Sequence, residues 1–136
     1  MTTALDSSFS ELHGDALLAS VRARIASALI GASGAVYVAA LEQLPEPMRV
    51  VHALDAFRDA LAVTPRDARV DQRYVRQAIE ALLAVRLVSH ADALARLLDE
   101  APAVPRMKLD RALATEGTDW DAALVAYLEW HRTTRH

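Results

Sequence analysis

Cysteine is absent from this chain of 136 residues. Its absence excludes a disulfide framework, a thiol nucleophile and a thiolate metal site. A chain without cysteine agrees with a reducing compartment, and we expect a cytoplasmic protein. Residues 1–9 are polar and lack the charged start and apolar run of a secretory signal peptide, so no such peptide is expected.

Glycine and aromatic residues are scarce. There are only 4 glycines, and aromatic side chains make up 5% of a chain that is 53% hydrophobic, with alanine supplying much of the difference. Runs of the β-branched residues that favour strands are missing. Alanine is the best helix former and loses no side-chain entropy in a helix. The composition therefore predicts an all-α protein whose helices pack closely through small side chains.

An excess of positive charge is also missing. The formal net charge of -3 argues against a protein that binds nucleic acid mainly by electrostatics. The length suits one domain around one core. We therefore predict a single all-helical domain over 1–136, with flexible ends at 1–8 and 132–136. The alanine- and arginine-rich, lysine-poor composition suggests a GC-rich bacterial genome.

One segment carries no charge at all. It runs from Ile25 to Leu41, about 17 residues, which is the lower limit for a membrane-spanning helix. Gly31, Ser33 and Gly34 lie together at its centre and favour a turn. We therefore predict a buried hairpin of two helices here and no membrane span.

Apolar spacing and helix breakers divide the chain into about seven helices. The first follows Ser10 and ends at Gly31, and the fifth begins after Ser89 as its N-cap. The others are expected at about 35–44, 47–63, 67 or 71 to 88, 106–115, and after a cap at 118 or 119. Short connections between helices of this length favour antiparallel hairpins, either as an irregular array or as a compact bundle.

A partial repeat signature lies in the third helix, where a small residue, an aromatic, a small residue and a proline follow one another. These are Ala53, Phe57, Ala60 and Pro65. In this order they resemble the second helix of a tetratricopeptide repeat. The preceding helix has Tyr37, Ala40, Leu41 and Leu44 at the family's signature positions, two of which match its pattern. The resemblance implies stacked helical hairpins and a role in protein interaction, as in the chaperones of bacterial secretion systems. An unrelated helical bundle is the alternative.

His52, Asp55 and Asp59 step by three and four residues and share one face of the third helix. A histidine with two carboxylates suits a divalent metal or acid–base chemistry. A solvated face whose acids pair with Arg49 and Arg58 explains the same pattern. No phosphate-binding loop or serine nucleophile motif is present, so we assign no catalytic residue and expect no cofactor.

The most concentrated positive feature is formed by Arg66, Arg69, Arg73 and Arg76, which step by three and four residues. On a continuous helix they would form one basic face, suited to docking an acidic protein partner. A solvated, ion-paired face is the alternative. Trp130, near the end of the last helix, is a second candidate for partner binding, whereas Trp120 is expected in the core.

These features favour a non-catalytic protein–protein interaction module, a small adaptor or chaperone-like protein that binds a protein partner or itself. The surplus of apolar residues on a small body also favours an oligomer. A ligand- or metal-binding bundle that uses His52, Asp55 and Asp59 is the alternative. A helix-turn-helix regulator drawn over 89–113 is disfavoured, because Asp99 and Glu100 fall in its turn.

Overall fold

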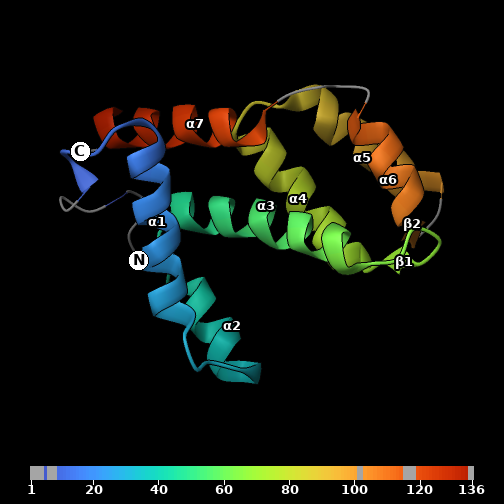
Figure 1. The fold of residues 1–136 in the computed structure, drawn as a ribbon, viewed down its shortest axis with the longest axis horizontal. Helices are drawn as coiled ribbons and strands as arrows, with labels where there is room; N and C mark the ends of the chain where they lie inside the picture. The colour runs from blue at the N-terminus through green and yellow to red at the C-terminus, as the bar shows by residue number, and fades with distance from the viewer. Residues whose placement is uncertain (1–4, 6–8, 101–102, 115–118, 135–136) are drawn as a thin grey trace. The chain divides into compact units, whose positions relative to one another are not determined.

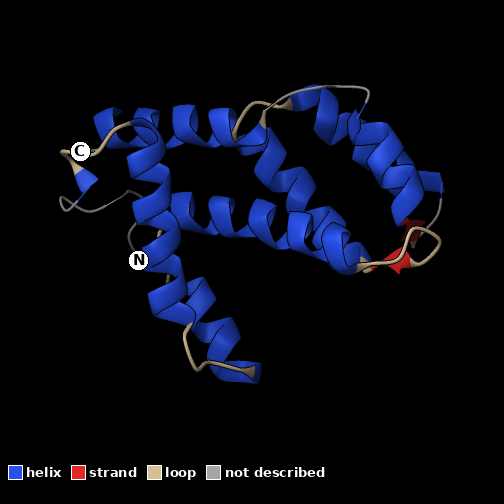
Figure 2. Ribbon diagram, in the orientation of Figure 1, coloured by secondary structure: helices blue, strands red, loops and turns tan. Residues whose placement is uncertain are grey.

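The computed structural model describes residues 5, 9–100, 103–114 and 119–134. The predicted all-α class is confirmed. The described part contains seven helices and a sheet of two very short strands (Figures 1 and 2). The elements in chain order are α1 (Gly14–Leu29), α2 (Gly34–Glu42), α3 (Glu46–Val63), β1 (Arg69–Val70), α4 (Gln72–Ala84), α5 (Val88–Glu100), β2 (Val104–Pro105), α6 (Arg106–Ala114) and α7 (Trp120–Thr134).

The chain divides into two compact units. The first comprises Met1–His52 and Trp120–His136, and the second comprises Ala53–Asp119. The first unit therefore joins segments from the two ends of the sequence. The single domain predicted from length stays a prediction.

In the first unit, α1 packs against α7. The buried face of α1 consists of Leu17, Leu18, Val21 and Ile25, and α7 contributes the fully buried Leu124 and Leu128. Arg22 and Asp121 join the two helices by an ion pair of 3.0 Å. At the start of α1, the backbone amide of Gly14 donates a hydrogen bond of 2.9 Å to the carboxylate of Glu129. These contacts hold α1 along α7.

In the second unit, α4 and α5 form an antiparallel pair joined at residues 85–87. Helix α4 ends here because Arg86 adopts a left-handed conformation with φ of 68°. The amide of Leu87 then bonds the carbonyl of Leu82 at 2.8 Å, and that of Arg86 bonds Leu83 at 3.1 Å, a Schellman motif. The prediction that this helix continues to Val88 is wrong. Position 86 has the left-handed conformation that usually belongs to glycine at a helix end, and here it is an arginine.

The loop before α4 and the loop before α6 pair through the strands. Arg69 lies opposite Pro105, and Val70 opposite Val104. The guanidinium of Arg106 extends the link by donating to the carbonyl of Thr64 at 2.8 Å. Strands of two residues have no recognisable period, so the sequence did not predict them. Asp71, the second of the two positions offered, is the N-cap of α4 and accepts from the amide of Arg73 at 2.9 Å.

The start of α5 differs from the prediction, and parts of both chain ends are described. Helix α5 begins at Val88, so Ser89 lies inside the helix and is not its N-cap, and His90 is buried. At the ends, Leu5 is buried and α7 continues to Thr134. The rest of the ends predicted to be flexible, 1–4, 6–8 and 135–136, lies outside the described residues.

Candidate interaction surface

The uncharged segment forms the hairpin that the sequence predicts. Helix α1 ends at Leu29, and Gly31 follows with φ of 73°, a left-handed conformation that glycine adopts without steric cost. The amide of Ala32 bonds the carbonyl of Leu29 at 3.1 Å, and Gly34 opens α2 with φ of 56°. Helix α2 then returns beside α1 (Figure 1).

The prediction that this hairpin is buried is wrong. Helix α2 contains no buried residue, although its only charged residue is Glu42 at its C-terminal end. Ile30 is 83% exposed, Val36 67% and Val38 53%. A helix that is apolar all round is normally covered on every side, in a protein core or in lipid. The exposed α2 is therefore an apolar patch of the kind that marks an interaction site.

The outer side of α1 continues this surface. Five exposed apolar residues, four on α1 and one at its C-cap, step by three and four, the spacing of a helix-packing seam. They are Ala16, Ala19, Ala23, Ala26 and Ile30. We call the exposed apolar residues of α1, the turn and α2 the hairpin surface. Because most of them are alanines, another helix can approach the backbone closely there.

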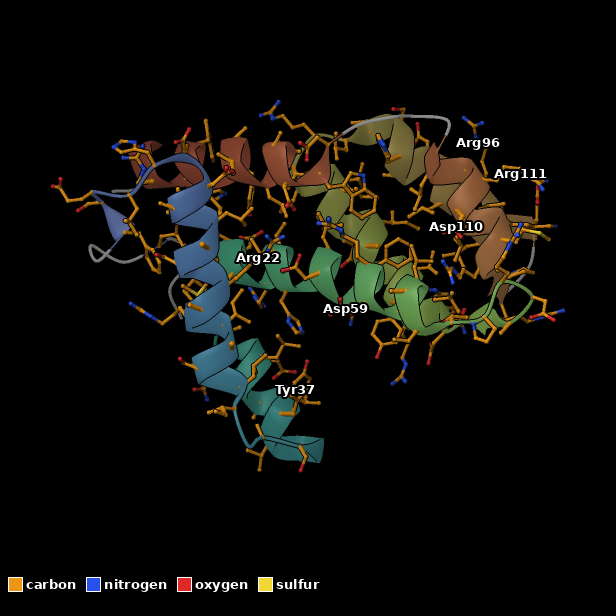
Figure 3. All side chains as sticks on the ribbon, in the orientation of Figure 1. Arg22, Tyr37, Asp59, Arg96, Asp110 and Arg111 are labelled. Carbon is orange, nitrogen blue, oxygen red and sulfur yellow. The ribbon has the colours of Figure 1, made fainter. Side chains whose placement is uncertain are left out.

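A polar contact ties the hairpin to the start of α3. The hydroxyl of Tyr37 on α2 lies 2.9 Å from Nε2 of His52 on α3, and the two rings are tilted at 58° with centroids 6.2 Å apart. Figure 3 shows Tyr37 on α2. The contact positions α2 through one partly buried side chain, so the remaining apolar residues of α2 stay available on the outside.

The structure places the predicted metal-ligand residues on α3 but does not gather them into a metal site. No group of three histidine, cysteine, aspartate or glutamate side chains within the described ranges is arranged to hold a metal ion. His52 bonds Tyr37, Asp55 lies 3.9 Å from Arg58, and Asp59 is exposed, as labelled in Figure 3. A role of these residues in ligand or metal binding stays a prediction.

The loop from Thr64 to Asp71 joins two helices, which is the setting of an EF-hand calcium site. Such a loop supplies oxygen ligands at alternating positions and a closing glutamate. The acids of this loop are Asp67 and Asp71, and Asp71 is hydrogen-bonded to Arg73 in the N-cap of α4. These hydrogen bonds lower the pKa of Asp71 below its usual value. The loop therefore lacks the ligand pattern of a calcium site.

The four arginines do not share one helix. Arg66 lies in the loop and Arg69 in β1, whereas Arg73 and Arg76 lie on α4. The expected single basic helix face is wrong because α4 begins only at Gln72. All four side chains are exposed, and Arg73 pairs with Asp71 at 3.0 Å. Their role in binding an acidic partner stays a prediction.

The helix-turn-helix drawn over 89–113 does not have the expected turn. Asp99 and Glu100 lie in the last turn of α5, and β2 follows before α6 begins at Arg106. Figure 3 labels Asp110 and Arg111 on α6 and Arg96 among the neighbouring side chains. Asp110 and Arg106 form an ion pair of 3.2 Å. Acids at the end of α5 would repel phosphate, as they were expected to do in a turn.

Trp130 is exposed on α7, as expected of an interface candidate, and belongs to an aromatic cluster. The ring of His131 lies edge-on to Trp130 and to Tyr127, with centroid distances of 4.9 and 4.5 Å. Burial, assisted by Glu46, raises the pKa of Tyr127 to about 12. Burial also lowers the pKa of His131 below its usual value of 6.5, with Glu46 opposing the change. A role of Trp130 in partner binding stays a prediction.

The lowered pKa of His131 predicts an acid-sensitive contribution to stability. Because the unfolded chain binds a proton here more readily than the folded one, the free energy of unfolding should fall as pH drops below 6.5 and level off below the folded pKa. His131→Gln should remove this part of the pH dependence. Urea unfolding at pH values from 7.5 to about 5 measures it, and identical pH profiles for the two proteins would contradict the prediction.

No helix in the described residues has the length and apolar character needed to cross a membrane. No protein-family model, curated protein or solved structure matches the chain. The uncharged sequence segment indicated where the hairpin surface lies, but nothing local in the sequence indicated that it is exposed.

Proposed function

We propose that this protein is a non-catalytic protein-interaction module, a small adaptor or chaperone-like protein that docks through the hairpin surface. One observation carries the proposal: α2 is apolar over its whole circumference, yet none of its residues is buried. The partial resemblance to tetratricopeptide repeats agrees with this role. The cysteine-free composition supports a cytoplasmic location, and the alanine- and arginine-rich, lysine-poor composition supports a bacterial source.

Burial drives the proposed association. Ile30, Val36 and Val38 contribute little to folding, because most of each side chain stays in water. Covering them would contribute roughly 1–2 kcal/mol each to binding. The neighbouring alanines add contact area with no loss of side-chain rotamer entropy. The hairpin surface therefore supplies the apolar centre that protein interfaces have.

The exposed arginines of the second unit, Arg66, Arg69, Arg73 and Arg76, would offer an acidic partner a separate contact. Such contacts affect the rate and salt dependence of association more than its final strength. They are therefore a secondary part of the proposal.

A photo-reactive amino acid placed at Val38 tests the proposed function in cells that naturally produce the protein. Val88 on α5 is the matched control, because both valines are 53% exposed. Irradiation should produce a covalent protein adduct from position 38 and little from position 88. Equal yields at the two positions, or no adduct at position 38, would contradict docking through the hairpin surface.

A further inference from the structure

We propose that a second copy of this chain covers the hairpin surface, with α2 packed antiparallel against α2 of the other copy about a two-fold axis at Val38. This inference rests on the proposed function and names the partner. Val38 is the midpoint of α2, which runs from Gly34 to Glu42. In this arrangement each copy places its own Val38 against the Val38 of the other.

The all-round apolar character of α2 favours a helical hairpin as the partner. A peptide laid along one side would leave the other exposed sides of the helix in water. A second hairpin brings two helices and an equally apolar surface. Each α2 then has α1 of its own copy on one side and the helices of the other copy on another. The result is a local four-helix packing, and two-fold symmetry makes the contact self-complementary.

The charges on α2 favour the antiparallel direction. Glu42 is exposed and is the charged residue of this helix. Parallel packing would put the two Glu42 carboxylates side by side, whereas antiparallel packing separates them by the helix length of about 12 Å. It also places each carboxylate at the N-terminus of the other α2, where the helix dipole is positive and the Ser33 side chain makes no capping bond.

Lipid is the less suitable cover for the same surface. The turn around Gly31 and Gly34 is the tip of the hairpin and would enter the bilayer first. Irregular backbone is not tolerated in the hydrocarbon region when it faces lipid. The charges that flank the uncharged segment, Arg24 and Glu42, also have opposite signs and give no net attraction to anionic lipid.

The available area predicts a weak dimer. The three large exposed side chains, Ile30, Val36 and Val38, present on the order of 400 Å² of apolar surface, the size of a functional patch. A standard interface covers about 800 Å² on each partner, so the alanines of the seam and the turn must supply the rest. We therefore expect dissociation in the micromolar range and a concentration-dependent mass.

Disulfide cross-linking tests the position of the axis, because the natural chain has no cysteine. Val38→Cys places one thiol at the proposed axis, and Val88→Cys places one at an equally exposed valine on α5, outside the hairpin surface. Mild oxidation at about 50 µM should convert most of the first variant, and little of the second, to a covalent dimer. Equal conversion of the two variants would overturn the proposed axis.

Sedimentation velocity tests the association itself, from about 1 to 300 µM protein. The double variant Val36→Glu, Val38→Glu adds two charges to α2, and Val63→Glu, Val88→Glu adds the same two at valines that are 80% and 53% exposed. Glutamate is a good helix former, so both variants should fold, and circular dichroism checks this. The α2 variant should dissociate at least about 30-fold more readily than the natural chain, whereas the control should stay within about threefold.

The outcomes separate this inference from the proposed function. A natural chain that stays monomeric over the whole range overturns self-association. If position 38 nevertheless cross-links to a different protein in cells, the interaction function stands with another partner. Binding of the monomer to anionic phospholipid vesicles, lost in the α2 variant, would overturn the second copy in favour of lipid. A monomer that gives no adduct at position 38 contradicts both proposals.

Discussion

Replacing Phe57 with alanine is expected to lower the free energy of unfolding by about 3–5 kcal/mol. Phe57 is fully buried on α3, and it is one of the largest buried side chains described. The substitution removes the whole ring and leaves a cavity that the surrounding helices fill only partly. Because domains of this size are stable by about 5–15 kcal/mol, the variant should be marginally folded.

Urea unfolding followed by circular dichroism measures this loss. Val63→Ala on the same helix is the control, because Val63 is largely exposed and its truncation should change stability by less than about 0.5 kcal/mol. A loss below about 1.5 kcal/mol for Phe57→Ala would contradict the described burial of the ring.

The same experiment tests the prediction of a single domain. Both tryptophans, Trp120 and Trp130, lie in the first compact unit, whereas Phe57 lies in the second. If the chain unfolds as one cooperative domain, the variant should shift the tryptophan fluorescence and circular dichroism transitions equally. Separate shifts would show that the two units unfold independently and would contradict the single-domain prediction.

Leu128→Ala on α7 is expected to cost about 2–5 kcal/mol. Leu128 is fully buried, and α7 packs against α1, the helix that carries one side of the hairpin surface. The loss should therefore appear in the unfolding transition followed by tryptophan fluorescence, because Trp120 and Trp130 lie on the same helix. Leu83→Ala makes the same chemical change at a side chain that is 48% exposed, and it should cost less than about 1 kcal/mol.

Near-ultraviolet circular dichroism adds a second measurement for Leu128→Ala, because it reports the packing of the aromatic cluster at Tyr127 and Trp130. We expect a weaker aromatic signal with most of the helix content kept. Equal stability losses for Leu128→Ala and Leu83→Ala would contradict the packing of α7 against α1.

Local signals in the sequence located most of the helices. Pro45 and Thr64–Pro65 coincide with breaks on either side of α3, and Gly31 and Gly34 mark the turn between α1 and α2. The errors fall where the local signal was misleading. Arg86 ends α4 in a left-handed conformation that is usual for glycine. The arginines before Gln72 have the spacing of a helix, but Arg69 and Val70 form a strand there.

The hairpin surface was likewise predicted only in part from the sequence. The absence of charge from Ile25 to Leu41 and the glycines in its middle are properties of the sequence, and they determined an apolar hairpin. Whether that hairpin is covered depends on residues far away in the chain. Helix α7, about 100 residues later, packs against α1, whose Leu17 and Val21 are fully buried, and no described element buries a residue of α2.

Composition and spacing by themselves therefore determined an all-helical protein with an uncharged hairpin, because helix propensity and helix breaking act within a few residues. The tertiary structure decided which apolar faces are buried, the division into two compact units and the distribution of the four arginines over a loop, a strand and a helix. Burial is set by contacts between distant segments, and no local pattern records which segment will lie on which face.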